Sequence, residues 1–322
     1  MILIIVAALV ALVLSLLLGV VYIDFLKKKM LQQYILEDAP ESHAQKAGTP
    51  TTGGVFVVVS IIMASLAALF MELKMTTQAQ VVLLTLIFYA LTGLKDDMSK
   101  IRKKKNQGLT PKNKLFLQIV IAILPALYVT LMGQTVVSLG SWSIDLGWLY
   151  PFFVIFLMTG VSNAVNLTDG LDGLAASTVA ISMIACCLFC YITGNIDIAI
   201  ICAATTGALL GFLYFNRHPA QVFMGDTGSL ALGGMMAVIA VIGKFELWLL
   251  LIGFIYMTET LSVIIQVTSF KLTGKRVFKM APIHHHFELC GWKETKVVAF
   301  FALITLLTSA AAVVLFKIFY AG

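Results

Sequence analysis

Charged residues are scarce in this chain of 322 residues. Asp, Glu, Lys and Arg make up only 12% of it, whereas soluble domains contain about 25%. Hydrophobic residues make up 60%, and the mean hydropathy is +0.98. So few charges cannot cover the surface of a soluble two-domain enzyme, which the composition therefore excludes. It predicts instead an all-α polytopic membrane protein, with residues 1–322 forming a single integral membrane domain.

Paired cysteines are also missing. Four of the five cysteines lie within apolar runs, and only Cys290 stands in a polar stretch. Disulfide frameworks and zinc sites need paired spacings in polar segments, so neither is expected. We interpret the closely spaced Cys186, Cys187 and Cys190 as small apolar packing residues rather than a metal cluster.

No basic residue precedes the first apolar run, which argues against a secretory signal peptide. Lysines 27–29 follow the run instead, so it predicts a transmembrane helix whose N-terminus lies outside. The alternating residues of 133–147 predict a small extracytoplasmic hairpin. Runs of about 20 apolar residues predict spans, and there are ten, at about 2–23, 54–71, 79–94, 115–132, 148–165, 174–193, 197–215, 229–243, 247–270 and 296–318.

Basic residues are unevenly divided between the two sets of loops. The loops at about 24–53, 95–114, 166–173, 216–228 and 271–296 hold 19 of the 22 Lys and Arg residues. They also hold 11 of the 16 acidic residues and all five histidines. Because positive loops face the cytoplasm, we expect these five loops to be cytoplasmic and to form the active site, with both termini extracytoplasmic.

Five aspartates stand where these loops meet predicted helices: Asp96, Asp97, Asp169, Asp172 and Asp226. Magnesium takes one or two carboxylates and completes its shell with phosphates and water. Aspartates also cap helix N-termini, but an adjacent pair with three more on one face favours a functional cluster. If the sixth helix begins near Asp169, the i,i+3 spacing places Asp169 and Asp172 on one helix face.

Glycines and histidines accompany these aspartates. The glycines beside Asp169, Asp172 and Asp226 would let backbone N–H groups approach an anion, although tight turns also explain them. His284, His285 and His286 cannot easily face one tetrahedral metal, so we expect them to bond to phosphate or sugar oxygens.

Three further features each allow two interpretations. Phe223, in a polar loop, is either a stacking platform for a planar base or a side chain buried at the membrane interface. The basic run 100–105 anchors the chain by its charge, attracts anionic headgroups and nucleotides, or does both. Glu259, within an apolar run, is either a polar link between helices or a functional group near the substrate groove.

Five segments, in order through the predicted cytoplasmic loops, resemble those of the phospho-N-acetylmuramoyl-pentapeptide transferase family. The resemblance covers about residues 24–296. The acidic segments are shared by the wider superfamily of polyprenyl-phosphate N-acetylhexosamine-1-phosphate transferases, whereas the first and last are more specific to this branch. The segments are Glu-Asp-Ala-Pro-Glu-Ser-His-Ala-Gln-Lys-Ala-Gly-Thr-Pro-Thr (37–51), Leu-Lys-Asp-Asp (94–97), Asn-Leu-Thr-Asp-Gly-Leu-Asp-Gly-Leu (166–174), Phe-Met-Gly-Asp-Thr-Gly-Ser (223–229) and Ala-Pro-Ile-His-His-His-Phe-Glu (281–288).

The resemblance implies a reaction in a bacterial cell membrane. Undecaprenyl phosphate would attack UDP-N-acetylmuramoyl-pentapeptide, giving lipid I and UMP in the first membrane step of peptidoglycan synthesis. Mg²⁺ dependence, contact with membrane lipids, ten helices and a homodimer are implied as well; nucleic acid is not. Whether an aspartate forms a covalent intermediate or acts only as a base is left open.

The resemblance also implies roles for individual residues. Asp226 would bind Mg²⁺ with support from Asp97, Asp96 would be the base for the lipid phosphate, and His285 would join them as a catalytic residue. Phe223 would stack on the uracil. The implied substrate-binding residues are Lys46, Thr51, Lys112, Asp169, Gly170, Leu171, Asp172, Asn216, Phe223, Met224, Gln266, His284 and His286.

Two other functions are kept as alternatives. A transporter also has many spans, but it places its ionisable residues near the membrane midplane and often has repeated halves. A sister transferase would use UDP-N-acetylglucosamine, which the 281–288 segment disfavours.

Overall fold

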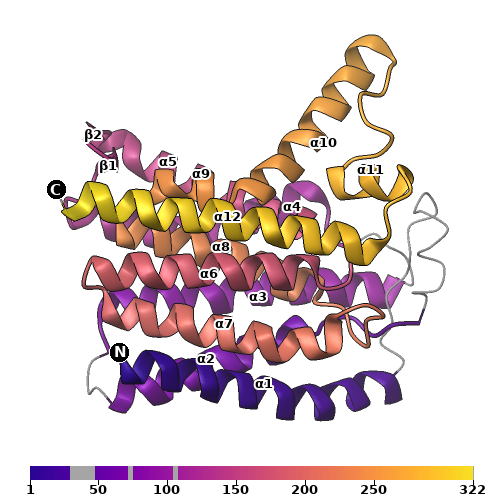
Figure 1. Cartoon of the computed structure of the whole chain (residues 1–322), viewed down its shortest axis with the longest axis horizontal. Coiled ribbons are helices and arrows are strands. Elements are labelled where there is room, and N and C mark those ends of the chain that lie inside the picture. Colours follow the sequence, from indigo (N-terminus) through magenta and orange to yellow (C-terminus); the bar gives the residue numbers. More distant parts are fainter. Residues whose placement is uncertain (30–47, 72–74, 104–107, 322) are drawn as a thin grey trace.

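The computed structural model describes residues 1–29, 48–71, 75–103 and 108–321. Most of its helices lie roughly side by side in an elongated bundle (Figure 1). The elements in chain order are α1 (Ile2–Lys28), α2 (Gly54–Met71), α3 (Thr77–Lys103), α4 (Pro111–Leu131), β1 (Val136–Leu139), β2 (Trp142–Asp145), η2 (Gly147–Leu149), α5 (Tyr150–Thr168), α6 (Leu174–Ile192), α7 (Ile196–Asn216), α8 (Gly225–Gly243), η3 (Glu246–Trp248), α9 (Leu249–Ile252), α10 (Phe254–Thr273), α11 (Ile283–Leu289) and α12 (Glu294–Ala321).

The helices confirm a polytopic membrane protein. Within the described residues, nine helices are long and apolar enough to cross a membrane, and the bent pair at 246–273 makes a tenth span if it counts as one. The predicted hairpin is also present: β1 and β2 pair antiparallel, with Val136 opposite Asp145 and Leu139 opposite Trp142.

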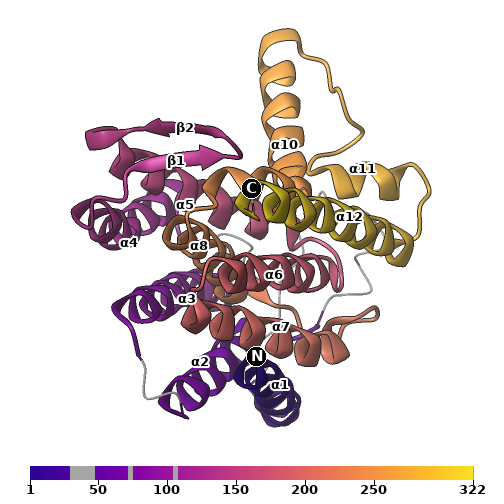
Figure 2. The same cartoon turned by 60° about the vertical axis from the view of Figure 1, so that its left-hand side comes forward.

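The prediction of one continuous helix over 247–270 is wrong. Segments Glu246–Ile252 and Phe254–Thr273 meet at an angle of 83° around Gly253. A Cβ at this position would lie 2.8 Å from the carbonyl oxygen of Leu249, so glycine permits the close turn. Beyond the turn, α10 leaves the bundle and projects away from it (Figure 2).

Helix α8 is the centre of the bundle. It packs against α3 and α5, while α1 packs on the outside against α7. The most apolar stretch of α8 is 89% buried, against 22% for α1. Small residues such as Gly233 and Gly234 let neighbouring helices approach it closely. Because α8 begins at Gly225, four residues before the predicted apolar run, Asp226 lies in its first turn.

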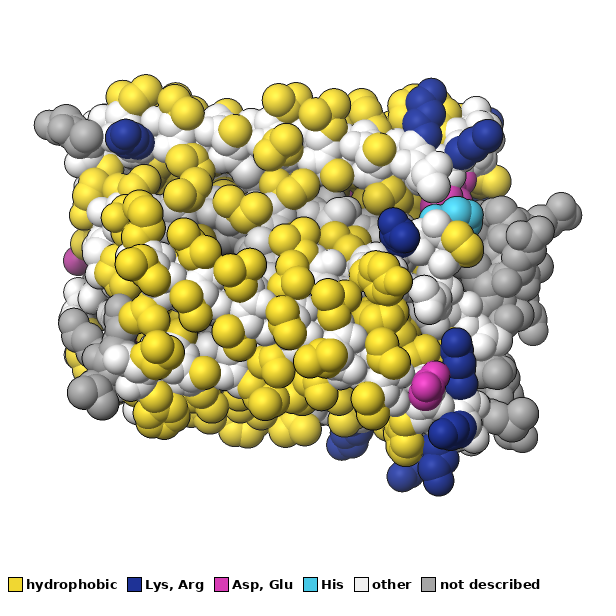
Figure 3. Space-filling view, turned by 60° about the horizontal axis from the view of Figure 1, so that its bottom comes forward, with side chains coloured by type: hydrophobic (Ala, Val, Ile, Leu, Met, Phe, Trp, Pro, Cys, Tyr) yellow, Lys and Arg dark blue, Asp and Glu magenta, His cyan; other side chains and the backbone are white. Residues whose placement is uncertain are grey.

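Polar and apolar side chains separate along the bundle. Apolar side chains cover the face seen in Figure 3, and most of its Lys, Arg, Asp, Glu and His side chains gather at one end. Helices α3, α5 and α7 carry Asp96, Thr168 and Asn216 to that end, which we call the aspartate end. The hairpin and both ends of the described chain lie at the opposite end (Figure 1).

Candidate active site

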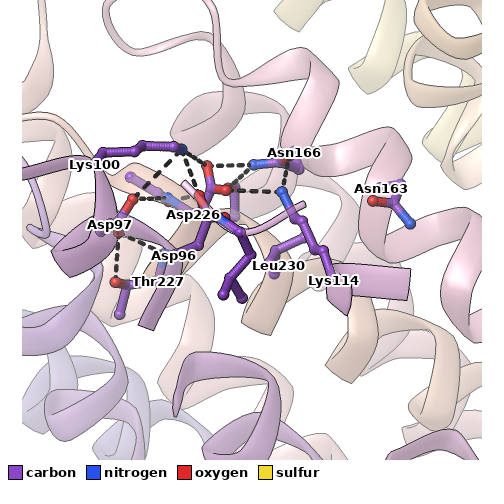
Figure 4. A network of polar contacts seen from close by, with 12 residues as sticks. Asp96, Asp97, Lys100, Lys114, Asn163, Asn166, Asp226, Thr227 and Leu230 are labelled. Carbon is purple, nitrogen blue, oxygen red and sulfur yellow. Dashed lines mark hydrogen bonds and ion pairs between the residues drawn. The ribbon is translucent and has the colours of Figure 1, made fainter. Parts of the chain in front are cut away.

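Three carboxylates meet at the aspartate end. Asp96 and Asp97 come from the last turns of α3, and Asp226 comes from the first turn of α8. One ligand oxygen from each lies within 4.8 Å of the other two (Figure 4). The expected cluster therefore forms from two segments about 130 residues apart, because α3 and α8 pack along each other.

Two lysines hold this cluster together. Lys100 Nζ lies 2.7 Å from Asp96 Oδ2 and 3.1 Å from Asp226 Oδ1. Lys114 Nζ lies 2.7 Å from Asp226 Oδ2. Sequence reasoning did not separate Lys100 from its basic neighbours, although its i,i+4 spacing from Asp96 was a usable signal. The family resemblance pointed to Lys112, which is exposed, and not to Lys114. No spacing in the sequence links Lys114 to an aspartate in the way that links Lys100 to Asp96.

Asp97 fixes the start of α8. Its Oδ1 accepts the N–H of Asp226 at 3.1 Å, and its Oδ2 accepts the N–H and hydroxyl of Thr227 at 3.0 and 2.6 Å. Gly225 has φ +72°, and a Cβ there would lie 2.6 Å from Asp97 Oδ2. The Gly-Asp-Thr sequence thus fits a cap supplied by another helix, which places Asp226 beside α3.

Asp96 is covered by the segment that precedes α4. Its Oδ1 accepts the N–H of Leu109 at 2.7 Å, and a Cβ on Gly108 would lie 2.4 Å from the same oxygen. The side chain of Asp96 is 3% exposed and that of Asp97 2%, against 13% for Asp226. Asp226 is therefore the most accessible carboxylate of the three.

Asn166, near the end of α5, connects the cluster to α4 and α8. Its Nδ2 donates to Asp226 Oδ1 at 3.0 Å and to Ser229 Oγ at 2.8 Å, while its Oδ1 accepts from Lys114 at 3.0 Å. Asn166 opens one of the recognised segments, but sequence reasoning did not single it out. It fixes the orientation of the Asp226 carboxylate.

The expectation that Asp169 and Asp172 share a helix face is wrong. Helix α5 ends at Thr168 and α6 begins at Leu174, so both lie in the loop between them. Asp169 is partly exposed. The protein around its carboxyl group still removes much of the hydration that would stabilise a charge, and this desolvation, together with the charges of Asp226 and Asp97, raises the pKa of Asp169 well above the ordinary value.

Asp172 points elsewhere. Its Oδ2 lies 3.0 Å from Nδ1 of His218 and accepts the N–H of Ala220 at 3.1 Å. Its own N–H donates to Glu294 Oε1 at 2.6 Å. Asp172, His218 and Glu294 form a second group whose atoms are close enough to hold a cation. This group ties the α5–α6 loop to the α7–α8 loop and to α12.

Several expected substrate contacts have their side chains turned into the protein. Leu171 and Met224 pack in apolar clusters. Asn216 accepts the N–H of Gly173 at 3.0 Å and donates to the carbonyl of Val222 at 2.9 Å, so it connects two loops. Gln266 accepts the N–H groups of 277 and 278 at 3.0 and 2.9 Å, which holds the loop after α10.

Phe223 and Thr51 lie beside the start of α8. Phe223 is partly buried, and its backbone pairs with Pro50 and Gly53, each at 2.8 Å. Thr51 is 5% exposed, and its Oγ1 would lie 3.0 Å from a Cβ on Gly225. Lys46 and most of the 37–51 segment lie outside the described residues.

The three histidines open α11 and point to different partners. Nδ1 of His284 lies 3.0 Å from Glu259 Oε1, and Nδ1 of His285 lies 2.8 Å from Glu288 Oε2. Nδ1 of His286 accepts the N–H of Lys279 at 3.1 Å. His284 thus links α11 to α10, and His286 links α11 to the loop that precedes it, while His285 bonds within α11.

Known proteins are similar in sequence to this chain. The model of glycosyl transferase family 4 matches residues 79–244, which include the three clustered aspartates. A phospho-N-acetylmuramoyl-pentapeptide-transferase of Geobacillus kaustophilus is 46% identical over 307 residues, covering 94% of this chain and 95% of that protein. The chain belongs to the phospho-N-acetylmuramoyl-pentapeptide-transferase family.

Other members agree with this assignment. The family's protein from Oceanobacillus iheyensis is 49% identical over 305 residues, covering 92% of this chain and 93% of its own. That from Halalkalibacterium halodurans is 47% identical over 306 residues, with 94% of each chain covered. The similarity to family members therefore extends well beyond the 79–244 core, across nearly the whole chain.

Proposed function

We propose that this chain transfers phospho-N-acetylmuramoyl-pentapeptide from its UDP-linked donor to undecaprenyl phosphate, releasing UMP and forming lipid I. Membership of the family supports the choice of substrates. The observation that carries the chemistry is the cluster of three carboxylates and two ammonium groups at one end of a membrane bundle. Such a site suits the joining of a water-soluble diphosphate to a phosphate anchored in the bilayer.

We assign Mg²⁺ to Asp226, with Asp97 as its supporting ligand. Carboxylate oxygens within 4.8 Å of one another suit a hard cation. Asp226 is the most exposed of the three carboxylates, whereas Asp97 already accepts three hydrogen bonds. When bound, the cation would neutralise part of the phosphate charge. Lys100 and Lys114 would bind phosphate oxygens from either side of Asp226.

Asp96 is proposed as the base that keeps the lipid phosphate ionised for attack. Its Oδ2 faces Lys100, which would also attract that phosphate. Because Leu109 donates to the other oxygen, the segment before α4 sets how open Asp96 is to the acceptor. His285 is proposed to contact the phosphate of the departing UMP, with Nδ1 held by Glu288.

The donor is proposed to lie across the α5–α6 and α7–α8 loops. Asp169, Gly170 and Phe223 are partly exposed in these two loops, so they can touch a nucleotide there. The buried members of the set would instead shape the backbone around it. Lys46, Lys112 and His286 stay proposed contacts for the sugar and phosphates, with Lys112 a minor one because its side chain is exposed to water. Thr51 is buried and is proposed to act with the other buried members.

The isoprenoid tail is proposed to enter an apolar cavity of about 300 Å³ between α5, α8 and the α9–α10 bend. Its walls include Phe153, Leu157, Met236 and Met257. A chain of branched hydrocarbon matches such walls, and burial of its methyl and methylene groups favours binding. We further propose a homodimer in the bacterial cell membrane.

A donor-swap assay tests the function. Purified protein in bilayer nanodiscs would receive undecaprenyl phosphate, Mg²⁺ and radiolabelled UDP-N-acetylmuramoyl-pentapeptide or UDP-N-acetylglucosamine. We expect labelled lipid and UMP only with the first donor. Lipid product only from the second donor would support the sister transferase, and uptake into proteoliposomes without lipid product would support a transporter.

The aspartate end is proposed to face the cytoplasm, as the distribution of 19 of 22 basic residues supports. Cys290 is the exposed cysteine at that end. We expect it to resist a membrane-impermeant thiol reagent added to intact cells. In a Cys290→Ser background, Ser141→Cys in the hairpin should react. The opposite labelling pattern would invert the topology.

A further inference from the structure

Glu259 is one of the buried carboxylates that lie outside the aspartate cluster. Glu259, on the inner face of α10, is 0% exposed, and its Oε1 lies 3.0 Å from Nδ1 of His284, which is 1% exposed. A carboxylate buried in a membrane-spanning helix is costly unless it is paired. The contact with His284 offsets part of that cost, so Glu259 and His284 form one buried unit between α10 and α11.

The other ring nitrogen of His284 faces the α5–α6 loop. A Cβ on Gly170 would lie 2.3 Å from Nε2, so only glycine leaves room for the imidazole at this point. Nε2 is buried and has no hydrogen-bond partner among the described residues. The residue before Gly170 is Asp169, whose pKa is raised by desolvation and by the charges of Asp226 and Asp97. Packing thus connects α10 to the loop beside the active site.

The contact with Glu259 favours one tautomer of His284 if the carboxyl group is ionised. An ionised carboxylate only accepts hydrogen bonds, so Nδ1 would then carry the proton of this bond. Nε2 then has none, and no N–H is left unsatisfied against Gly170. A proton on Nε2 would instead place a buried donor against a methylene group, which is unfavourable.

We propose that Glu259 is a positioning residue for the donor site. It holds His284 in the Nδ1–H tautomer as a support beneath Gly170, and so fixes the loop that carries Asp169. The inference rests on the proposed function, in which this loop binds the nucleotide end of the donor. Binding of the nucleotide-sugar, rather than of the lipid acceptor, depends on Glu259.

The tautomer can be measured without turnover. The chain has five histidines, so ¹⁵N-histidine spectra in nanodiscs can be assigned with His284→Gln. We expect an Nδ1–H signal in the wild type and in Glu259→Gln, whose amide oxygen still accepts. Glu259→Leu should lose this preference. An Nε2–H signal in the wild type, or an unchanged signal in Glu259→Leu, would refute the positioning of the ring.

Kinetics separate positioning from a general structural effect. Glu259→Leu should raise KM for UDP-N-acetylmuramoyl-pentapeptide about tenfold, equivalent to about 1.4 kcal/mol, with KM for undecaprenyl phosphate and kcat nearly unchanged. Glu259→Gln should restore most of the loss. The double variant Glu259→Leu/His284→Gln should match His284→Gln alone, because Glu259 acts through His284. Additive losses, or equal rises in both KM values, would contradict the proposal.

Asp197→Asn is the matched control. Asp197 is also a buried carboxylate in a span, but it bonds to Thr76 at the opposite end of α7 from Asn216, so donor KM should not change. If Glu259→Leu does not fold, Glu259→Asp, which withdraws the carboxylate by one methylene, should raise donor KM selectively. A wild type that forms no lipid product would refute the proposed function, while the histidine spectra would still decide the tautomer.

Discussion

Lys114 and Lys112 form a natural test pair, since they stand two residues apart at the start of α4. Lys114 Nζ lies 2.7 Å from Asp226 Oδ2 and 3.0 Å from Asn166 Oδ1. Lys112 is exposed. We predict that Lys114→Met lowers kcat/KM far more than Lys112→Met, although the resemblance pointed to Lys112.

The size of the effect follows from the contacts. The side chains of Lys114 and Asp226 are 17% and 13% exposed, so water weakens their attraction less than it would for a surface pair. Hydrogen bonds to charged groups contribute about 1.5–3 kcal/mol, which corresponds to roughly 10- to 150-fold in kcat/KM. Methionine keeps most of the length of the side chain, so the change removes mainly the ammonium group. Lys112→Met should cost less than about threefold.

Initial rates of lipid formation, with each substrate varied in turn, would measure this difference in nanodiscs. Thermal unfolding of both variants controls for loss of fold. If Lys112→Met lowered kcat/KM as much as Lys114→Met while both variants were equally stable, the ion pair between Lys114 and Asp226 would not explain the loss of activity. Equal and near-normal rates in both variants would remove Lys114 from the active site.

Three further predictions address the aspartates and the turns around them. Asp226→Asn should raise the Mg²⁺ concentration needed for activity, because hard Mg²⁺ binds a neutral amide less well. Asp96→Asn should instead lower kcat about 10²–10⁴-fold and leave the Mg²⁺ dependence unchanged. Identical Mg²⁺ profiles of the two variants would refute their different roles. Gly225→Ala should lower Tm more than Gly274→Ala. Both glycines have φ near +71°, but a Cβ on Gly225 would lie 2.6 Å from Asp97 Oδ2, whereas a Cβ on Gly274 would meet nothing within 4 Å. Equal shifts of Tm in calorimetry would contradict this. The raised pKa of Asp169 means that ionisation destabilises the folded state, so the stability from its neutral form is lost as pH rises through that pKa. Asp169→Asn should therefore unfold at a higher temperature than the wild type at alkaline pH, with the gap closing as pH falls; a constant gap would exclude ionisation as the cause.

The sequence located the membrane helices well because each needs about 20 apolar residues, a signal carried by composition alone. It did not reveal the bend at Gly253. That bend depends on how α9 and α10 pack, and an apolar run reads the same whether it is straight or bent by 83°. The apolar run predicted the start of α6 at residue 174 correctly, but it did not exclude an earlier start near Asp169, since aspartates and glycines suit both a helix start and the loop that is present.

The family motifs pointed to three aspartates that the structure brings together, but not to the different contacts that each of them makes. Asp96 and Asp97 are adjacent in sequence, yet one meets Leu109 and Lys100 while the other caps α8. Successive residues on a helix point about 100° apart, so neighbours in the chain face different surroundings. Only the packing of α3 against α8 decides which side each carboxylate faces.

The sequence by itself determined that this chain is a polytopic membrane protein of the transferase family, with its acidic and basic residues gathered in one set of loops. Hydrophobic length and charge are properties of the local chain, so they can be read without the fold. The tertiary structure decided that Lys114 and Asn166 meet Asp226, and that Glu259 meets His284. Those contacts join residues from different helices, and their distances depend on how whole helices pack.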